Sequence, residues 1–225
     1  MIIDLQFFGG RGASSGGESL PASSKGLSPS DIVSEQDVWS YRHNKNNEPF
    51  VDAMNQSART VQKDFPGLMD TVNYVNAGTL KGGAAQSVLG YYGGGRVALN
   101  TNYTNVKKMN SVYDDGVRSG YHPSRGNKSG TEAVMYHELG HAITDHIKDK
   151  VGAKDLDKAS KKIVNDAYKN SNGKGGTKAW AGQISKYAQE SFAEAVAEAA
   201  ADFYCNREKA SKPSKAIMKE LKKYK

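Results

Sequence analysis

The sequence predicts an α+β domain in which a small antiparallel or mixed sheet is followed by a helix with metal-binding residues and by a helical C-terminal half. Three observations predict this class. Short strand-like runs separated by glycines lie between residues 70 and 103, a His-Glu-x-x-His pattern lies at residues 137–141, and an alanine-rich run with helical spacing fills residues 185–206. Strand patterns that come first and helical patterns that follow, without alternation, are typical of α+β proteins.

Composition divides the chain into three parts. Residues 1–35 are rich in Gly and Ser, and we expect a disordered tether because they cannot bury enough apolar surface to offset the entropy of ordering. Residues 36–205 are expected to form the domain. Residues 206–225 hold eight Lys or Arg against two Glu, which is most of the net charge of +7, and predict a basic C-terminal helix or tail. A solvated helix face is the commoner reason for such a run, so nucleic acid is not an expected partner.

The start of the chain does not predict export. The first ten residues are apolar but contain Asp4 and no basic residue, so this stretch is too short and wrongly flanked for a signal peptide. No run approaches the roughly 18 to 20 apolar residues of a membrane span. We therefore expect a cytoplasmic protein without a membrane partner. The single cysteine, Cys205, excludes an intramolecular disulfide and is expected to be buried in a helix.

Periodicity predicts the elements outside the motif. Apolar residues at helical spacing predict helices over residues 48–64 and 155–170. Alternation of apolar and polar residues predicts a strand over residues 70–76. Residues 104–128 contain three glycines and a proline, and are expected to be mainly loop.

Two further strands are predicted immediately before that loop. Residues 87–92 and 96–103 alternate in polarity, and Gly93-Gly94-Gly95 between them predicts the turn of a hairpin. We expect the second strand to run beside the functional site and to pair along its edge with an extended peptide.

The His-Glu-x-x-His pattern lies on a predicted helix. Ser129-Gly-Thr-Glu132 is typical of a capping box at its start, and Gly152 predicts its end. Residues four apart share a helix face, so His137 and His141 can bind one metal ion. Glu138 then faces a water on that ion, which predicts a zinc site with Glu138 as the general base of a metalloprotease.

The alanine-rich run predicts the rest of the metal site. Glu190, Glu194 and Glu198 lie four residues apart, and catalytic zinc usually has three protein ligands with one position open. We predict Glu190 as the third ligand, with Glu194 one turn further on, where it would accept the second ring N–H of a liganding histidine. The alternative is that these glutamates face solvent on a surface helix.

A third histidine lies in the predicted loop. His122, within Ser119–Ser124, is a candidate to contact substrate or to donate to the oxyanion. The alternative is an ordinary loop histidine.

The two motifs together resemble those of a known family. His137-Glu-Leu-Gly-His141 with the later Glu190-Ser-Phe-Ala-Glu-Ala is similar to the gluzincin metallopeptidases, and most similar to the catalytic domain of anthrax lethal factor and its phage-borne relatives, over roughly residues 85–205. The resemblance implies a zincin-like fold, the zinc ligands His137, His141 and Glu190, and the base Glu138. Asp145 matches an Asp that follows the second histidine in that group, and is expected to support the ligands.

One feature departs from the family pattern. In the family, a tyrosine several residues before the third ligand stabilises the oxyanion, whereas here Tyr187 lies only three residues before Glu190. Tyr187 is therefore either the counterpart of that tyrosine or a packing residue. The start Met1-Ile-Ile-Asp-Leu-Gln-Phe-Phe-Gly-Gly10 also resembles the openings of head-associated proteins of phages and mobile elements.

The expected function is zinc-dependent hydrolysis of a peptide bond in a protein or peptide substrate, by a protein encoded in a phage or mobile element. The main alternative is a virion-associated structural protein of the phage head, whose partners are virion components and whose zinc site is degenerate or purely structural. A toxin-like effector that cleaves a host protein is a third hypothesis. A polyanion-binding module that uses the basic tail is a fourth.

Overall fold

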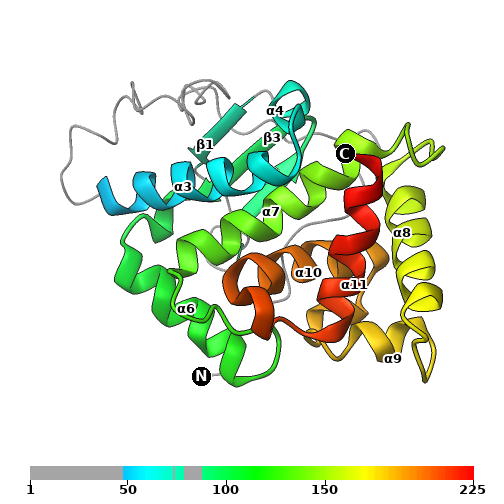
Figure 1. The fold of residues 1–225 in the computed structure, drawn as a ribbon. Helices are drawn as coiled ribbons and strands as arrows, with labels where there is room; N and C mark the ends of the chain where they lie inside the picture. Colours follow the sequence, from blue (N-terminus) through cyan, green and yellow to red (C-terminus); the bar gives the residue numbers. More distant parts are fainter. Residues whose placement is uncertain (1–47, 73, 79–87) are drawn as a thin grey trace.

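The structure, a computed structural model, describes residues 48–72, 74–78 and 88–225 (Figure 1). The predicted tether, residues 1–35, lies outside these residues. The helices are α3 (Glu48–Asp64), α4 (Leu68–Thr71), α6 (Val106–Arg118), α7 (Gly130–Ile147), α8 (Leu156–Asn170), α9 (Thr177–Ala181), α10 (Phe192–Asn206) and α11 (Lys212–Leu221). The strands are β1 (Tyr74–Gly78), β2 (Gly90–Gly93) and β3 (Arg96–Asn100), and the 3-10 turns are η1 (Thr101–Tyr103), η2 (Tyr187–Gln189), η3 (Arg207–Lys209) and η4 (Lys222–Tyr224).

The sheet is small and mixed. Its strand order is β1-β3-β2, with β1 parallel and β2 antiparallel to β3. Gly94 and Gly95, with φ of 57° and 74°, form the turn between β2 and β3, since a tight hairpin turn of this kind needs positive φ at both central residues. The predicted α+β class and the hairpin are therefore confirmed. The predicted edge pairing of the strand at 96–103 is wrong, because β3 has a neighbour on each side and β2 is an edge of the described sheet.

Two local predictions are wrong. The strand predicted at 70–76 begins only at Tyr74, because α4 extends to Thr71. The loop predicted at 104–128 contains α6, which Asn105 caps by accepting a hydrogen bond from the backbone N–H of Lys108. Met109 and Tyr113 of α6 are buried, so tertiary packing stabilises a helix whose glycines and polar residues had favoured a loop.

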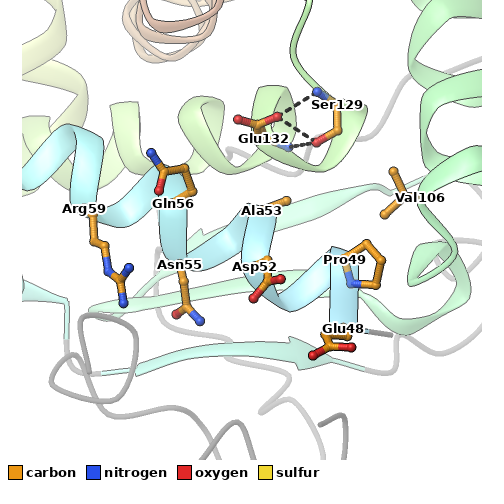
Figure 2. Close-up of a pocket in the computed structure, with 10 residues that line it drawn as sticks. All are labelled: Glu48, Pro49, Asp52, Ala53, Asn55, Gln56, Arg59, Val106, Ser129 and Glu132. Atoms are coloured by element: carbon orange, nitrogen blue, oxygen red, sulfur yellow. Dashed lines mark hydrogen bonds between the residues drawn. The ribbon is translucent and has the colours of Figure 1, made fainter. Parts of the chain in front are cut away.

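Helix α7 is the centre of the fold. It contacts α3, α6, α8, α10 and two strands, and Figure 1 shows it crossing the middle of the molecule. The capping box predicted at its start is present, with the Ser129 hydroxyl oxygen accepting from Glu132 N at 3.2 Å and Glu132 Oε2 accepting from Ser129 N at 2.8 Å (Figure 2). Nearly every residue of α7 is buried, which places the motif inside the molecule.

Helix α10 packs unusually closely on α7. A Cβ atom at Gly140 would lie 2.7 Å from the Cα atom of Ala197, a separation that real side chains do not reach. Glycine at position 140 therefore allows α10 to approach α7 this closely.

The C-terminal residues belong to the same core. Ile217, Met218 and Leu221 of α11 are buried against the rest of the hydrophobic cluster, and α11 packs on α8 and α10. The basic segment at 206–225 is therefore an integral helix whose lysines lie on its outer side, and it is not a detached tail. No described helix is long and apolar enough to cross a membrane.

Candidate metal centre

The two histidines of the motif face one carboxylate from α10. Nε2 of His137 lies 3.2 Å from Oε2 of Glu194, and Nε2 of His141 lies 3.6 Å from the same oxygen. All three residues are at most 5% exposed. Helices α7 and α10 thus bring two imidazoles and one carboxylate together in the interior.

These separations suit a bound zinc ion. Zinc bonds of roughly 2.0–2.2 Å to nitrogen and oxygen place the ligands of a tetrahedral site about 3.3–3.5 Å apart. The two Glu194 distances bracket that value. Oε2 of Glu194 is also buried without a hydrogen bond of regular geometry. Burial alone would raise the pKa of Glu194, but the adjacent His141 and His137 hold it below its usual range, so this carboxylate is ionised.

Glu198, one turn further along α10, fixes the orientation of His137. Its Oε1 accepts from Nδ1 of His137 at 2.8 Å. Although burial opposes ionisation, its histidine partners lower the pKa of Glu198 to about 2, so it acts only as an acceptor. Nδ1 of His137 therefore carries the hydrogen, and in the neutral ring the lone pair of Nε2 points to Glu194. The lone pair of His137 Nε2 and the carboxylate oxygen of Glu194 lie 3.2 Å apart, and they would repel each other without a cation or a proton between them. An imidazole nitrogen and a carboxylate oxygen are both ligands that zinc takes.

Glu138 has the properties of a general base. Burial raises its pKa to about 7, although the adjacent imidazoles of His137 and His141 oppose the rise when they are protonated. A base works best when its pKa lies near the operating pH. Its Oε1 is buried without a hydrogen bond, and a Cβ at Gly90 of β2 would lie 2.7 Å from this atom. Glycine at position 90 therefore makes room for the carboxylate beneath an edge strand.

A different grouping of possible ligands is also present. Atoms of His137, Glu138 and His141 all lie within 4.8 Å of one another. Glu194 is the better candidate to hold an ion with the two histidines, because its oxygen is within 3.6 Å of both Nε2 atoms and its carboxylate stays ionised. Glu138, with its raised pKa, is the poorer ligand and the better base.

The structure does not bring Glu190 to the histidines. Glu190 is exposed, precedes α10 and accepts a hydrogen bond from Tyr121 Oη at 3.1 Å. The two glutamates that contact the histidines therefore lie one turn later than predicted: Glu194 faces both Nε2 atoms, and Glu198 accepts the second ring N–H of His137. The sequence did contain a signal that could have identified Glu194. Ser191 caps α10 by accepting a hydrogen bond from the backbone N–H of Glu194, which leaves Glu190 outside the helix.

His122 lies behind the centre and does not line an open surface. Its side chain has no exposed area, its Nδ1 lies 3.3 Å from Oε1 of Glu198, and its ring stacks on Tyr113 at 5.1 Å between centroids. This position does not favour the predicted contact with substrate or oxyanion.

Tyr187 stacks on His137. Its ring lies 5.8 Å from that of His137, with 14° between their planes, and the residue is 1% exposed. With Glu194 as the ligand, Tyr187 precedes the ligand by seven residues, so the short spacer counted from Glu190 no longer applies. The ring contact supports the packing role, and the oxyanion role stays a prediction.

Asp145 lies between a strand and the motif helix. It accepts from Tyr92 Oη of β2 and from Lys148 Nζ, both at 2.6 Å. These contacts connect β2 to α7. The resemblance implied instead that Asp145 supports the zinc ligands, and neither contact involves them.

Comparisons with protein-family models, with curated proteins and with solved structures were made for the whole chain. None gives a match. The case for the metal centre therefore rests on the geometry above.

A cavity beside α3 is separate from this centre (Figure 2). It is lined by residues of α3, by Val106, and by Ser129 and Glu132 at the start of α7. None of the histidines or the α10 carboxylates lines it, so we do not assign it to the same chemistry.

Proposed function

We propose that the protein is a zinc-dependent peptidase of the gluzincin type, with His137, His141 and Glu194 as ligands. The observation that supports this most directly is the approach of one ionised α10 carboxylate to the Nε2 atoms of both histidines. The residues fit the ion in number, in chemistry and in separation. The zincin-like fold is part of this proposal.

The chain's own residues have the following roles. Zinc bound by these ligands would polarise the scissile carbonyl and lower the pKa of a bound water. Glu138 removes a proton from the attacking water and delivers it to the leaving amine. Glu198 keeps Nδ1 of His137 protonated, so Nε2 remains available to the ion.

Two features bear on how a substrate would lie. β2 is an edge strand and its Gly90 lies against Glu138, so we propose that an extended peptide adds to β2. Burial and the negative charge of Glu194 raise the pKa of Tyr187, so its phenol stays protonated and is chemically able to donate to an oxyanion.

A structural zinc site is the second candidate function. His137, His141 and Glu194 are between 2% and 5% exposed, which is typical of a closed site. In that case the protein would be a scaffold, such as a component of a phage head, with virion proteins as partners.

Metal analysis and a peptidase assay separate the two candidates. For the peptidase we expect stoichiometric zinc in the purified chain, hydrolysis of a mixed peptide library, and loss of the zinc in His141→Ala. Stoichiometric zinc with no hydrolysis of any peptide in the library would favour the structural site. Absence of zinc after loading would exclude both.

A further inference from the structure

The residues around Glu198 suggest a role for His122 that the sequence did not predict. Glu198 is 1% exposed and both of its oxygens are occupied. Oε1 accepts from His137 at 2.8 Å and from His122 at 3.3 Å, and Oε2 accepts from the Ser185 hydroxyl at 2.7 Å. His122 and Ser185 therefore hold the carboxylate that orients a proposed ligand.

The ring of His122 is itself tightly placed. Tyr113 stacks on one face, with 12° between the planes, and the edges meet Tyr121 and Tyr187 at near-perpendicular angles. Gly116 of α6 leaves the necessary space, because a Cβ there would lie 2.5 Å from Cδ2 of His122. A ring enclosed in this way keeps its Nδ1 directed at Glu198.

The backbone on either side of His122 is held as well. Gly116 O accepts from the N–H groups of Tyr121 and His122, at 2.8 and 3.3 Å. Tyr187 N donates to Tyr121 O at 3.2 Å, so the loop after α6 is tied to the segment that leads into α10. The position of His122 is thus set from two elements that carry no ligand.

We propose that His122 is a positioning residue of the metal centre: its N–H fixes Glu198, and Glu198 in turn fixes the ring of His137. This inference rests on the proposed zinc site and adds α6 and its following loop to that site. Because the imidazole acts through Glu198, its removal should weaken zinc binding although all three proposed ligands are still present in the chain.

Zinc affinity of the full chain tests the proposal, measured by competition with a chromophoric chelator. His122→Phe keeps a flat ring against Tyr113 but loses the N–H, and we expect zinc to bind about 10- to 100-fold more weakly. His122→Gln keeps an N–H donor and should recover part of the affinity. His146→Phe is the matched control, because His146 lies on α7, the helix of the motif, but pairs with Thr71 Oγ1, at 2.8 Å.

A spectroscopic measurement accompanies the affinity. With Co²⁺ in place of zinc, the visible bands of His122→Phe should shift, since a reoriented His137 changes the ligand field, and those of His146→Phe should not. Equal zinc affinity and an unchanged cobalt spectrum in His122→Phe would overturn the inference while leaving the proposed zinc site intact. A wild-type chain that binds no zinc would overturn both.

A second pair of variants covers the case in which His122→Phe does not fold. Gly116→Ala should displace the His122 ring and weaken zinc binding in the otherwise wild-type chain. In a His122→Ala background there is no ring to displace, so the same change should have no further effect on affinity. An equal loss of affinity in both backgrounds would contradict the positioning role, as would no loss in either.

Discussion

Helices α7 and α10 are both buried along nearly their whole length, but their buried polar groups differ: α7 buries two imidazoles and one acid, Glu138, whereas α10 buries carboxylates and no imidazole. α7 contributes the imidazoles of the proposed centre, and α10 contributes three buried acids, Glu194, Glu198 and Asp202. Buried charges are costly unless they are paired. Glu194 and Glu198 meet the histidines, whereas Asp202 accepts from the Ser211 backbone and the Ser214 hydroxyl at the start of α11.

The difference shows how one helix can serve two purposes. The first two acids of α10 contact the histidines of the proposed metal centre, and the last joins the end of α10 to α11. The acids in the first turns of α10 therefore face the proposed metal centre, and the acid in a later turn stabilises the packing of α11. Four measurements test this contrast.

The largest expected effect is on hydrolysis. Glu138→Gln should lower kcat/KM by about 10²- to 10⁴-fold, because the carboxamide cannot accept the proton from water. Zinc content, measured by mass spectrometry of the metal, should stay at the wild-type level. Wild-type turnover by this variant would remove Glu138 from the role of base.

The next effect tests which glutamate near the start of α10, Glu190 or Glu194, would bind the metal. Glu194→Gln should weaken zinc binding by more than the roughly 10- to 100-fold expected when a residue behind the ligands is lost, since an ionised ligand disappears. Glu190→Gln is the matched control and should bind zinc as the wild type does, because Glu190 contacts Tyr121 and is exposed. The reverse result would restore the ligand predicted from the sequence.

A third effect is on stability and depends on pH. The pKa of Glu138 is about 7 in the folded chain, above the ordinary value of 4.5, so folding favours its protonated form. That contribution is complete at low pH and is lost as the pH rises through 7. Glu138→Gln should therefore stabilise the metal-free chain at pH 8, by about 3 kcal/mol if the full shift applies.

Urea denaturation with a chelator present measures this difference. We expect the advantage of Glu138→Gln over the wild type to shrink as the pH falls from 8 to 5. An advantage that is the same at both values would mean that the carboxyl group is not the source.

The smallest expected effect tests the contact between the two helices. Gly140→Ala places a methyl group 2.7 Å from the Cα of Ala197, a backbone atom that cannot move aside easily. We expect a loss of about 1–3 kcal/mol in the free energy of unfolding, seen as a lower midpoint in urea. Lys161→Ala, on the exposed side of α8, should change it by no more than about 0.5 kcal/mol.

The sequence was most informative where structure is determined locally. The capping box at Ser129, the helix that follows it and the hairpin turn at Gly94-Gly95 each depend on residues within a few positions of one another. Local rules predict such features, because the interacting groups are visible together in the sequence.

Features that depend on tertiary contacts were missed. Helix α6 is stabilised by buried Met109 and Tyr113, which the glycines and polar residues around them concealed. Acids recur every four residues in and just before α10, so spacing alone allowed Glu190 to be chosen one turn before Glu194, the residue that faces the histidines. Only the start of the helix at Ser191 and the distance to α7 distinguish Glu194 from Glu190.

The way α11 covers α10 also affects when the centre can form during synthesis. Ser211 and Ser214, which pair with Asp202, are made after every proposed ligand. A ribosome must release nearly all of the described chain before α11 can pack on α10 and α8. The chain would then bind its ion only after α11 has been translated. A nascent chain that still lacked α11 would hold the histidines and their acidic partners in an incompletely packed core.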